Sequence, residues 1–280
     1  HWVIGLSGYH VRMSFNPRLL PLAIFASIFM MGTSLTAAGV IEDDPLEGLP
    51  DKVASQVKSK LPGVVLKRDE TVAALSKPED WLPLSQASFV FDRPKNTGKS
   101  TRWTIAPATR TPGAGKNSKA RGWTIVQENG STRYLRVTSE GAIESTITVN
   151  HPNGMLIRLD PAEPVIREPG ARKASNAIKI SVCDLGSPSD VEYSGNARCT
   201  WEDLGGFQVK VPSGEYSARL ISVSYQGSVG PASVDGTRLM FVAAGVGPVA
   251  FTDDRDISAF LFFNDDTDHA GVLREVQRSE

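Results

Sequence analysis

Residues 122–138, GWTIVQENGSTRYLRVT, hold two apolar–polar alternating runs on either side of Asn129-Gly130. Period-two alternation is typical of a half-buried strand, because successive side chains point to opposite faces. Asn-Gly between two such runs is the strongest short-range signal for an antiparallel hairpin. This stretch therefore predicts antiparallel β structure.

The same pattern continues in both directions from the hairpin. Turn residues recur about every 8–12 residues, which is the spacing of sandwiches and barrels. The sequence predicts a mainly β fold, an antiparallel curved sheet, open barrel or sandwich, with a short N-terminal helix. Strands are predicted at 88–91, 102–105, 122–127, 132–138, 143–149, 155–159, 177–182, 193–201, 207–211, 216–225, 238–243, 249–252 and 259–263.

Helical signals are confined to the region before the strands. Val53, Val57 and Leu61 recur at i, i+4 and i+8, and Pro62-Gly63 ends the pattern. The stripe is narrow, so this helix is expected to pack on a larger element. A second short helix is predicted over 70–76, and the alternative for both segments is a mobile leader.

The N-terminal region has the pattern of a signal peptide that begins at Met13. Arg18 precedes an apolar run at 19–31, and small residues at 36–38 predict cleavage before Gly39. As a helix, the apolar run spans about 20 Å, less than the roughly 30 Å of a bilayer core. We therefore expect no transmembrane anchor after cleavage, and a periplasmic or secreted protein.

The predicted organisation has four parts. Residues 160–175 contain three prolines and are either a domain boundary or a crossing within one sheet, so the β region has one or two halves. The parts are upstream residues plus signal peptide at 1–38, a leader and helical segment at 39–85, a β domain at 86–265, and a polar tail at 266–280.

Composition excludes several classes of protein. Thirty Lys and Arg stand against 31 Asp and Glu, for a formal net charge of −1. This balance does not fit a protein that binds nucleic acid through a broad basic surface, so no nucleic-acid partner is expected. Two cysteines are too few for a zinc site made of four thiolates.

The two cysteines are predicted to form a disulfide. An even pair in an exported chain favours a structural bond, and the segment between Cys183 and Cys199 is rich in turn residues. The alternative is a redox-active pair, which usually has the closer C-x-x-C spacing.

A weak calcium pattern lies near the C-terminus. Asn264, Asp266, Asp268 and Glu275 occupy positions 1, 3, 5 and 12 of a calcium-binding loop. Position 6, which is Gly in such loops, is His269, and a strand is predicted where the preceding helix should be. The alternative is an acidic, solvated chain end, and no other cofactor is expected.

Two segments carry a resemblance to known proteins. Residues 207–225, FQVKVPSGEYSARLISVSY, read as strand, tight turn and strand, and residues 238–251, RLMFVAAGVGPVAF, as a strand with a glycine bend. This order resembles exported, largely uncharacterised β-sheet proteins of bacterial envelopes, over residues 207–251. The resemblance implies a curved half-barrel, similar in shape to the carriers that ferry lipoproteins to the outer membrane, and assigns no catalytic residue.

A curved sheet has a concave apolar face that must be covered by its own helix or by a bound molecule. The leading prediction is therefore a non-enzymatic exported protein that binds a hydrophobic small molecule or an envelope protein. One alternative is an assembly component of the envelope that acts by strand-edge pairing. Another is an enzyme acting on polysaccharide, which would need two facing carboxylates that the sequence does not identify.

Overall fold

The computed structural model describes residues 44–95, 98–109, 112, 122–259, 263–264 and 267–278. The chain divides into two units, residues 1–42 and 43–280, and the described residues belong to the second. The predicted upstream residues and signal peptide lie outside the described residues. No helix in the described ranges is both long and apolar enough to cross a membrane.

The second unit is built from strands and two short helices. The helices are α1 (Asp51–Lys60) and α2 (Pro78–Trp81). The strands are β1 (Val65–Arg68), β2 (Ala87–Asp92), β3 (Ser100–Pro107), β4 (Trp123–Gln127), β5 (Ser131–Val137), β6 (Ile143–Asn150), β7 (Met155–Ile166), β8 (Lys173–Asp184), β9 (Val191–Val211), β10 (Gly214–Val229), β11 (Ala232–Ala243), β12 (Gly247–Ala259), β13 (Phe263–Asn264) and β14 (Thr267–Arg278).

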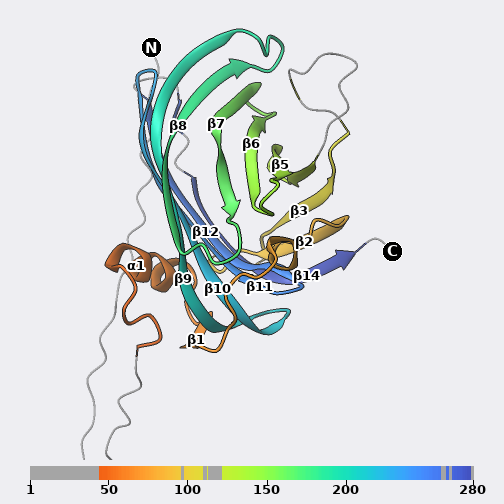
Figure 1. Ribbon diagram of the computed structural model, residues 1–280, viewed down its shortest axis with the longest axis vertical. Coiled ribbons are helices and arrows are strands. Elements are labelled where there is room, and N and C mark those ends of the chain that lie inside the picture. The colour runs from red at the N-terminus through yellow and green to blue at the C-terminus, as the bar shows by residue number, and fades with distance from the viewer. Residues whose placement is uncertain are drawn as a thin grey trace, which may run out of the picture. The chain divides into compact units, whose positions relative to one another are not determined.

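The strands form a closed antiparallel barrel, so the predicted open or curved sheet is wrong (Figure 1). The order around the barrel is β9-β10-β11-β12-β14-β2-β3-β4-β5-β6-β7-β8, and β8 pairs again with β9. Closure depends on β14, which pairs with β12 on one side and with β2 on the other. The sequence predicts only a polar tail there, and without β14 the sheet would remain open.

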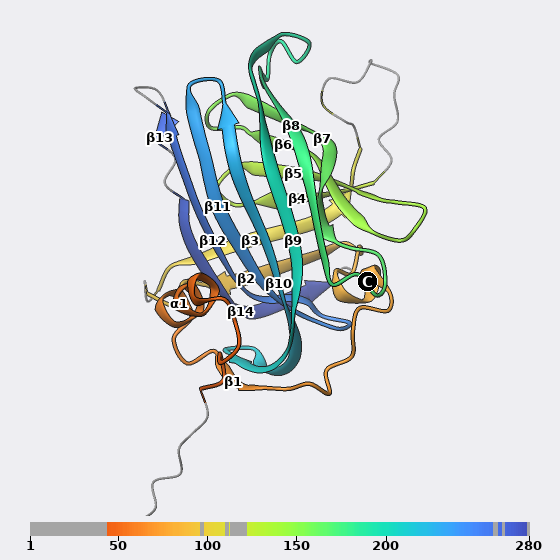
Figure 2. The same cartoon turned by 60° about the vertical axis from the view of Figure 1, so that its left-hand side comes forward.

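The barrel is built from long and short strands. In Figure 2, β9, β10, β11 and β12 run along the molecule, and β2–β6 lie behind them and cross their direction. The β4–β5 hairpin at Asn129-Gly130 is confirmed, with Trp123 paired to Leu135 and Gly130 at φ 82°. Residues 193–201 and 207–211 belong to one strand, β9, which continues through a register shift opposite Arg219 and Ile221.

Helix α1 lies against the outside of β11 and β12 (Figures 1 and 2). Its buried residues are Val53, Gln56 and Val57. The Gln56 amide donates to the Thr237 carbonyl (3.0 Å) and to the Thr252 hydroxyl (2.7 Å). The predicted N-terminal helix is therefore confirmed as a helix docked on the barrel wall.

The connection between β1 and β2 is anchored by buried contacts. The predicted helix over 70–76 is wrong, because these residues form turns and irregular chain, and only α2 is helical. Arg219 holds the segment by donating to the Val72 carbonyl (2.9 Å) while it forms an ion pair with Asp203 (2.8 Å). The hydrogen bond from Arg219 to the Val72 carbonyl thus holds this segment in place without helical hydrogen bonds.

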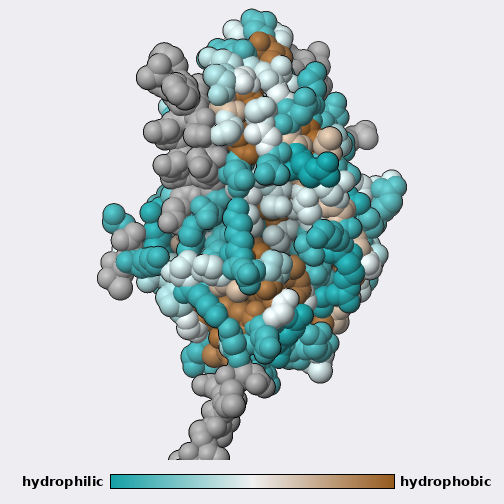
Figure 3. Space-filling view, turned by 90° about the vertical axis from the view of Figure 1, so that its left-hand side faces the viewer, coloured by the Kyte–Doolittle hydropathy of each residue, from teal (hydrophilic) through white to brown (hydrophobic). Residues whose placement is uncertain are grey.

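The outer surface on the α1 side is mostly hydrophilic, with an apolar area in its lower half (Figure 3). The largest apolar side chains lie in the interior, where Trp201, Phe91 and Phe241 are 0% exposed. Phe91, Trp103 and Phe251 form an aromatic cluster with ring centroids 4.4 to 5.1 Å apart. The barrel therefore contains a packed aromatic core.

Candidate binding site in the barrel interior

Four charged residues meet inside the barrel and form what we call the interior ion cluster: Arg133, Glu163, Arg238 and Asp253. Glu163 Oε1 accepts from Arg133 Nη2 (2.7 Å) and from Arg238 Nη1 (2.9 Å). Arg238 Nη2 also contacts Asp253 Oδ2 at 3.2 Å. The Arg238 guanidinium therefore joins two carboxylates.

The position of the cluster follows from the strand order. Arg238 is on β11 and Glu163 on β7, and these strands are not neighbours in the barrel. Their side chains can meet only across the interior. The side chains of Arg133 and Glu163 are 9% and 6% exposed, so the charges are largely removed from water. Burial of charges is costly unless they are paired.

Tyr225 and Cys199 lie beside the cluster as a directly opposed pair on β10 and β9. Burial raises the pKa of the Tyr225 phenol well above its usual range, and the charge of Glu163 acts in the same direction. Burial also raises the pKa of the Cys199 thiol to about 12. Both groups are therefore neutral at physiological pH, which avoids adding negative charge next to Glu163.

These two pKa shifts predict a loss of stability at alkaline pH. A buried acid with a raised pKa favours the folded state below its unfolded pKa, and this contribution falls as pH rises toward the folded value. Between about pH 9 and 12, each group is expected to remove up to ~1.4 kcal/mol per pH unit from the free energy of unfolding. Urea titrations measure the free energy of unfolding at pH 8 and at pH 11. Between these two pH values it should fall less for Tyr225→Phe than for the parent protein. An equal fall would contradict the raised pKa of Tyr225.

One row of side chains runs from the cluster across the inner face. Directly opposed residues in neighbouring strands share a face, so the row can be followed through the pairing. Arg133 pairs with Thr148, Thr148 with Ile157, and Ile157 with Val182. The row thus leads from a buried cation to apolar side chains.

Several inward apolar side chains remain partly exposed. We call Ile157, Leu159, Val182 and Val234 the inner apolar wall, and each is intermediate in exposure. The pairing places these residues on one face with other apolar side chains. Leu159 is directly opposite Ile180. The row from Val234 runs through Gly227 and Ala197 to Ile178. By contrast Trp201, at the other end of the same face of β9, has no exposure. One part of the interior is therefore closed, while the other presents apolar surface.

The barrel wall is incomplete next to this surface. Strand β7 pairs with β8 only as far as Asp160, opposite Lys179, whereas the remainder of β7 pairs with β6. Residues 173–178 of β8 pair with β9 alone. Pro161 and Pro164 lie in the diverging part of β7 and lack the N–H that a ladder needs. Trp201 bridges the divergence by donating from Nε1 to the Val165 carbonyl (3.2 Å).

The predicted disulfide between Cys183 and Cys199 is wrong, because both cysteines are free and buried. Cys199 is opposite Asn176 on β8, seven residues along that strand from Cys183. At ~3.3 Å per residue the two lie about 23 Å apart, far beyond the roughly 7 Å limit between the Cα atoms of a disulfide. The two thiols therefore lie at different positions along the extended β8–β9 hairpin. The number of residues between the cysteines and the turn residues among them do not predict this separation.

Thiol labelling should confirm the reduced state. After denaturation in urea without reductant, the full chain is expected to take up two iodoacetamide adducts. In the native state Cys199 should react far more slowly, because its raised pKa keeps it protonated. Intact-protein mass spectrometry counts the adducts, and an unlabelled denatured chain would show that a disulfide had formed.

The calcium pattern stays a prediction. Asp266 and the side chains of Asn264 and Asp268 lie outside the described residues, whereas Glu275 is exposed on β14 and accepts from Gln277 Nε2 (2.7 Å). No group of three potential metal ligands occurs among the described residues.

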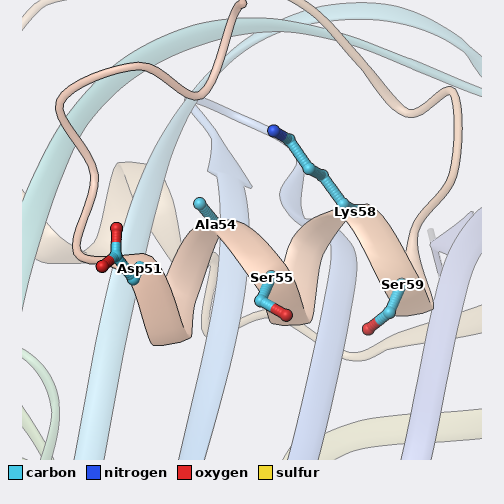
Figure 4. Close-up of a pocket in the computed structure, with 5 residues that line it drawn as sticks. All are labelled: Asp51, Ala54, Ser55, Lys58 and Ser59. Atoms are coloured by element: carbon cyan, nitrogen blue, oxygen red, sulfur yellow. The ribbon is translucent and has the colours of Figure 1, made fainter.

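Two surface depressions lie outside the barrel interior. One follows the outward side of α1, where Asp51, Ser55 and Lys58 line it (Figure 4). The other, about 370 Å³, lies over β2, β3 and β4 and is lined by Arg102, Glu128 and neighbouring side chains. Neither depression is lined by a residue of the interior ion cluster.

The residues of the ion cluster were not predicted from the sequence. The sequence feature that could have indicated the cluster is a charged residue beside a run of buried apolar residues. Arg238 is such a residue, because it directly precedes the buried run 239–243. Alternation alone suggests that such a residue faces solvent, and its partners come from strands distant in sequence. Only the barrel closure shows that β7 and β11 face each other.

Comparisons with known proteins give one distant structural likeness. No protein-family model matches the chain, and no curated protein matches it. A Bacteroides fragilis protein, described as exported and with a YmcC-like fold, aligns at 10% identity with a TM-score of 0.33. The alignment covers 74% of this chain and all of the other. The likeness is too low to support an argument about function, and the predicted similarity to lipoprotein carriers is not shown.

Proposed function

We propose that this chain is a non-enzymatic binding protein that acts outside the cytoplasm, and that it holds a hydrophobic small molecule against the inner apolar wall. The observation that carries the proposal is the partial exposure of inward-facing apolar residues beside a closed aromatic core. Exposed apolar surface on a concave face is stabilised when a ligand covers it. The extracytoplasmic location rests on the predicted signal peptide.

The interior offers more support for binding than for catalysis. Glu163 and Asp253 are the buried carboxylates of the ion cluster, and Arg238 binds both. A glycosidase needs one carboxyl group as an acid and another facing the substrate. Here the carboxylate oxygens that contact Arg238 already form ion pairs, so the arrangement favours a positioning role.

The proposal is tested with a neutral apolar probe, 1-decanol, and calorimetric titration of the full chain. Leu159→Asn is expected to weaken decanol binding about fivefold or more, because a ligand contact of roughly 1–2 kcal/mol is lost. The control is Leu66→Asn on β1, where Leu66 is 45% exposed on an element outside the barrel. Equal weakening in both variants, or no decanol binding by the parent protein, would reject the proposal.

A complementary measurement identifies a natural ligand. The protein is purified from a bacterial periplasm and its mass is measured under native conditions. A copurified lipid-sized mass that disappears in Leu159→Asn would support the inner wall as the site. A mass retained in that variant would assign the molecule to another surface.

The unpaired part of β8 favours a second candidate, strand addition by an envelope partner. Lys173, Ser175, Asn176 and Ala177 are exposed, and one edge of this segment has no neighbouring strand among the described residues. An extended peptide could pair with such an edge. Backbone amides of residues 173–178 should then become protected from hydrogen exchange in the complex, while those of the exposed α1 surface stay unchanged.

A further inference from the structure

Arg133 is a buried cation with incomplete neutralisation. Its side chain is 9% exposed, and its one hydrogen bond among the described residues is the Nη2 contact to Glu163. That carboxylate oxygen is shared with Arg238. A guanidinium has five N–H donors, so most of those on Arg133 have no acceptor among the side chains and backbone groups that the structure describes.

The other donors of Arg133 are not completely enclosed by protein atoms. Fully enclosed polar atoms without a partner occur on Gln56, Ser145, Arg167 and Arg219, and no nitrogen of Arg133 is among them. The remaining Arg133 nitrogens are therefore not fully enclosed, in keeping with the 9% exposure of the side chain. Arg238 differs, because two carboxylates occupy its guanidinium.

The surroundings of Arg133 favour an added negative charge. Burial lowers the pKa of Arg133, and the like charge of Arg238 acts with burial. The interactions with Glu163, Tyr225 and Asp253 oppose this lowering only in part. An anion hydrogen-bonded to the remaining Arg133 nitrogens would compensate the buried charge. Carboxylate and phosphate groups fit a guanidinium through paired, charge-assisted hydrogen bonds.

The row that starts at Arg133 also defines where the rest of such a ligand would lie. Thr148, Ile157 and Val182 follow Arg133 on successive strands. At ~4.8 Å per strand, Val182 is about 14 Å from Arg133, which is the length of an extended chain of roughly ten carbons. The inner apolar wall therefore begins within reach of a head group bound at Arg133.

We propose that the interior selects an anionic amphiphile, with its carboxylate or phosphate head on Arg133 and its alkyl chain along Ile157 and Val182. This inference rests on the proposed function and adds the chemical class of the ligand. Arg133 donates hydrogen bonds to the head group, and the inner apolar wall packs against the alkyl chain. Glu163 and Arg238 position the guanidinium.

The experiment compares decanoate, decyl phosphate and 1-decanol by calorimetric titration of the full chain. The parent protein is expected to bind at least one anionic probe on the order of tenfold more tightly than decanol, as expected for hydrogen bonds to a charged group. Arg133→Gln should abolish this preference, because the guanidinium that binds the charged head is lost, and Arg133→Lys should retain part of it. The ratio of decanoate to decyl phosphate affinity identifies the head group.

The matched control is Arg136→Gln on the same strand, where the Arg136 side chain is 55% exposed and pairs with Glu144. It should leave all three affinities unchanged. Equal affinity of the parent for decanol and both anions would overturn this inference while the proposed function stands. Absence of binding by all three probes would overturn both. Thermal unfolding of each variant shows whether the fold is kept, and Arg133→Lys provides the comparison if Arg133→Gln unfolds.

Discussion

Replacing Arg238 with Met is expected to lower the free energy of unfolding by about 3–5 kcal/mol, the range measured when one partner of a buried ion pair is removed. Arg238 is joined to Glu163 and to Asp253, whose side chains are 6% and 12% exposed. The variant leaves two carboxylates with less compensation in the interior. Methionine fills a similar length, so the loss reports mainly on charge.

Urea unfolding at pH 7 measures this loss, and two further variants make it interpretable. Arg136→Met removes an exposed pair with Glu144 and should cost no more than about 1 kcal/mol. Adding Asp253→Asn to Arg238→Met should recover part of the loss, because one buried negative charge is then removed while the Arg133–Glu163 pair is kept. A loss below 1 kcal/mol for Arg238→Met alone would mean that water reaches the cluster freely.

Replacing Trp201 with Ala is expected to lower the free energy of unfolding by about 3–5 kcal/mol. The Trp201 side chain is fully buried, and its indole N–H bonds the Val165 carbonyl across the region where β7 and β8 diverge. The variant loses packed volume and leaves that carbonyl unpaired. Trp201→Phe should cost less, because it keeps most of the volume.

The position of Trp201 adds a second readout to this prediction. Hydrogen exchange in residues 161–166 and 173–178 should accelerate in Trp201→Ala, since the indole hydrogen bond to Val165 spans the divergence there. The same residues in Trp123→Ala, where the parent side chain is only partly buried on β4, serve as the comparison. Equal acceleration in both variants would show general loosening of the barrel.

Local features of the fold were predictable because their signals lie close together in sequence. The Asn129-Gly130 hairpin needs only a turn and two alternating runs, and α1 needs only the stripe of Val53 and Val57. Closure is different, because β14 gains its place by pairing with β2, which is distant in sequence. Its alternation, Ala270, Val272 and Val276, is short and surrounded by charge, so it resembles a solvated tail.

The candidate site was not predictable for the same reason. Arg133, Glu163, Arg238 and Asp253 each look like a solvent-facing residue of a strand, and their distances depend on a closed barrel. The disulfide prediction used the number and spacing of the cysteines. These do not predict how β8 and β9 pair, and the pairing places the two cysteines far apart. The predicted preference for hydrophobic ligands came from a general property of concave sheets, and the structure adds the residues on which it can be tested.

The dependence of closure on β14 has a consequence for biosynthesis. Residues 272–278 pair with residues 87–92, so the emerging chain cannot close the barrel until residues 272–278 have been synthesised. Until then β2 and β12 each have an unsatisfied side on which other chains could assemble. Pairing over so long a separation also slows folding. The period between synthesis of β2 and synthesis of β14 is therefore when this chain is most exposed to aggregation.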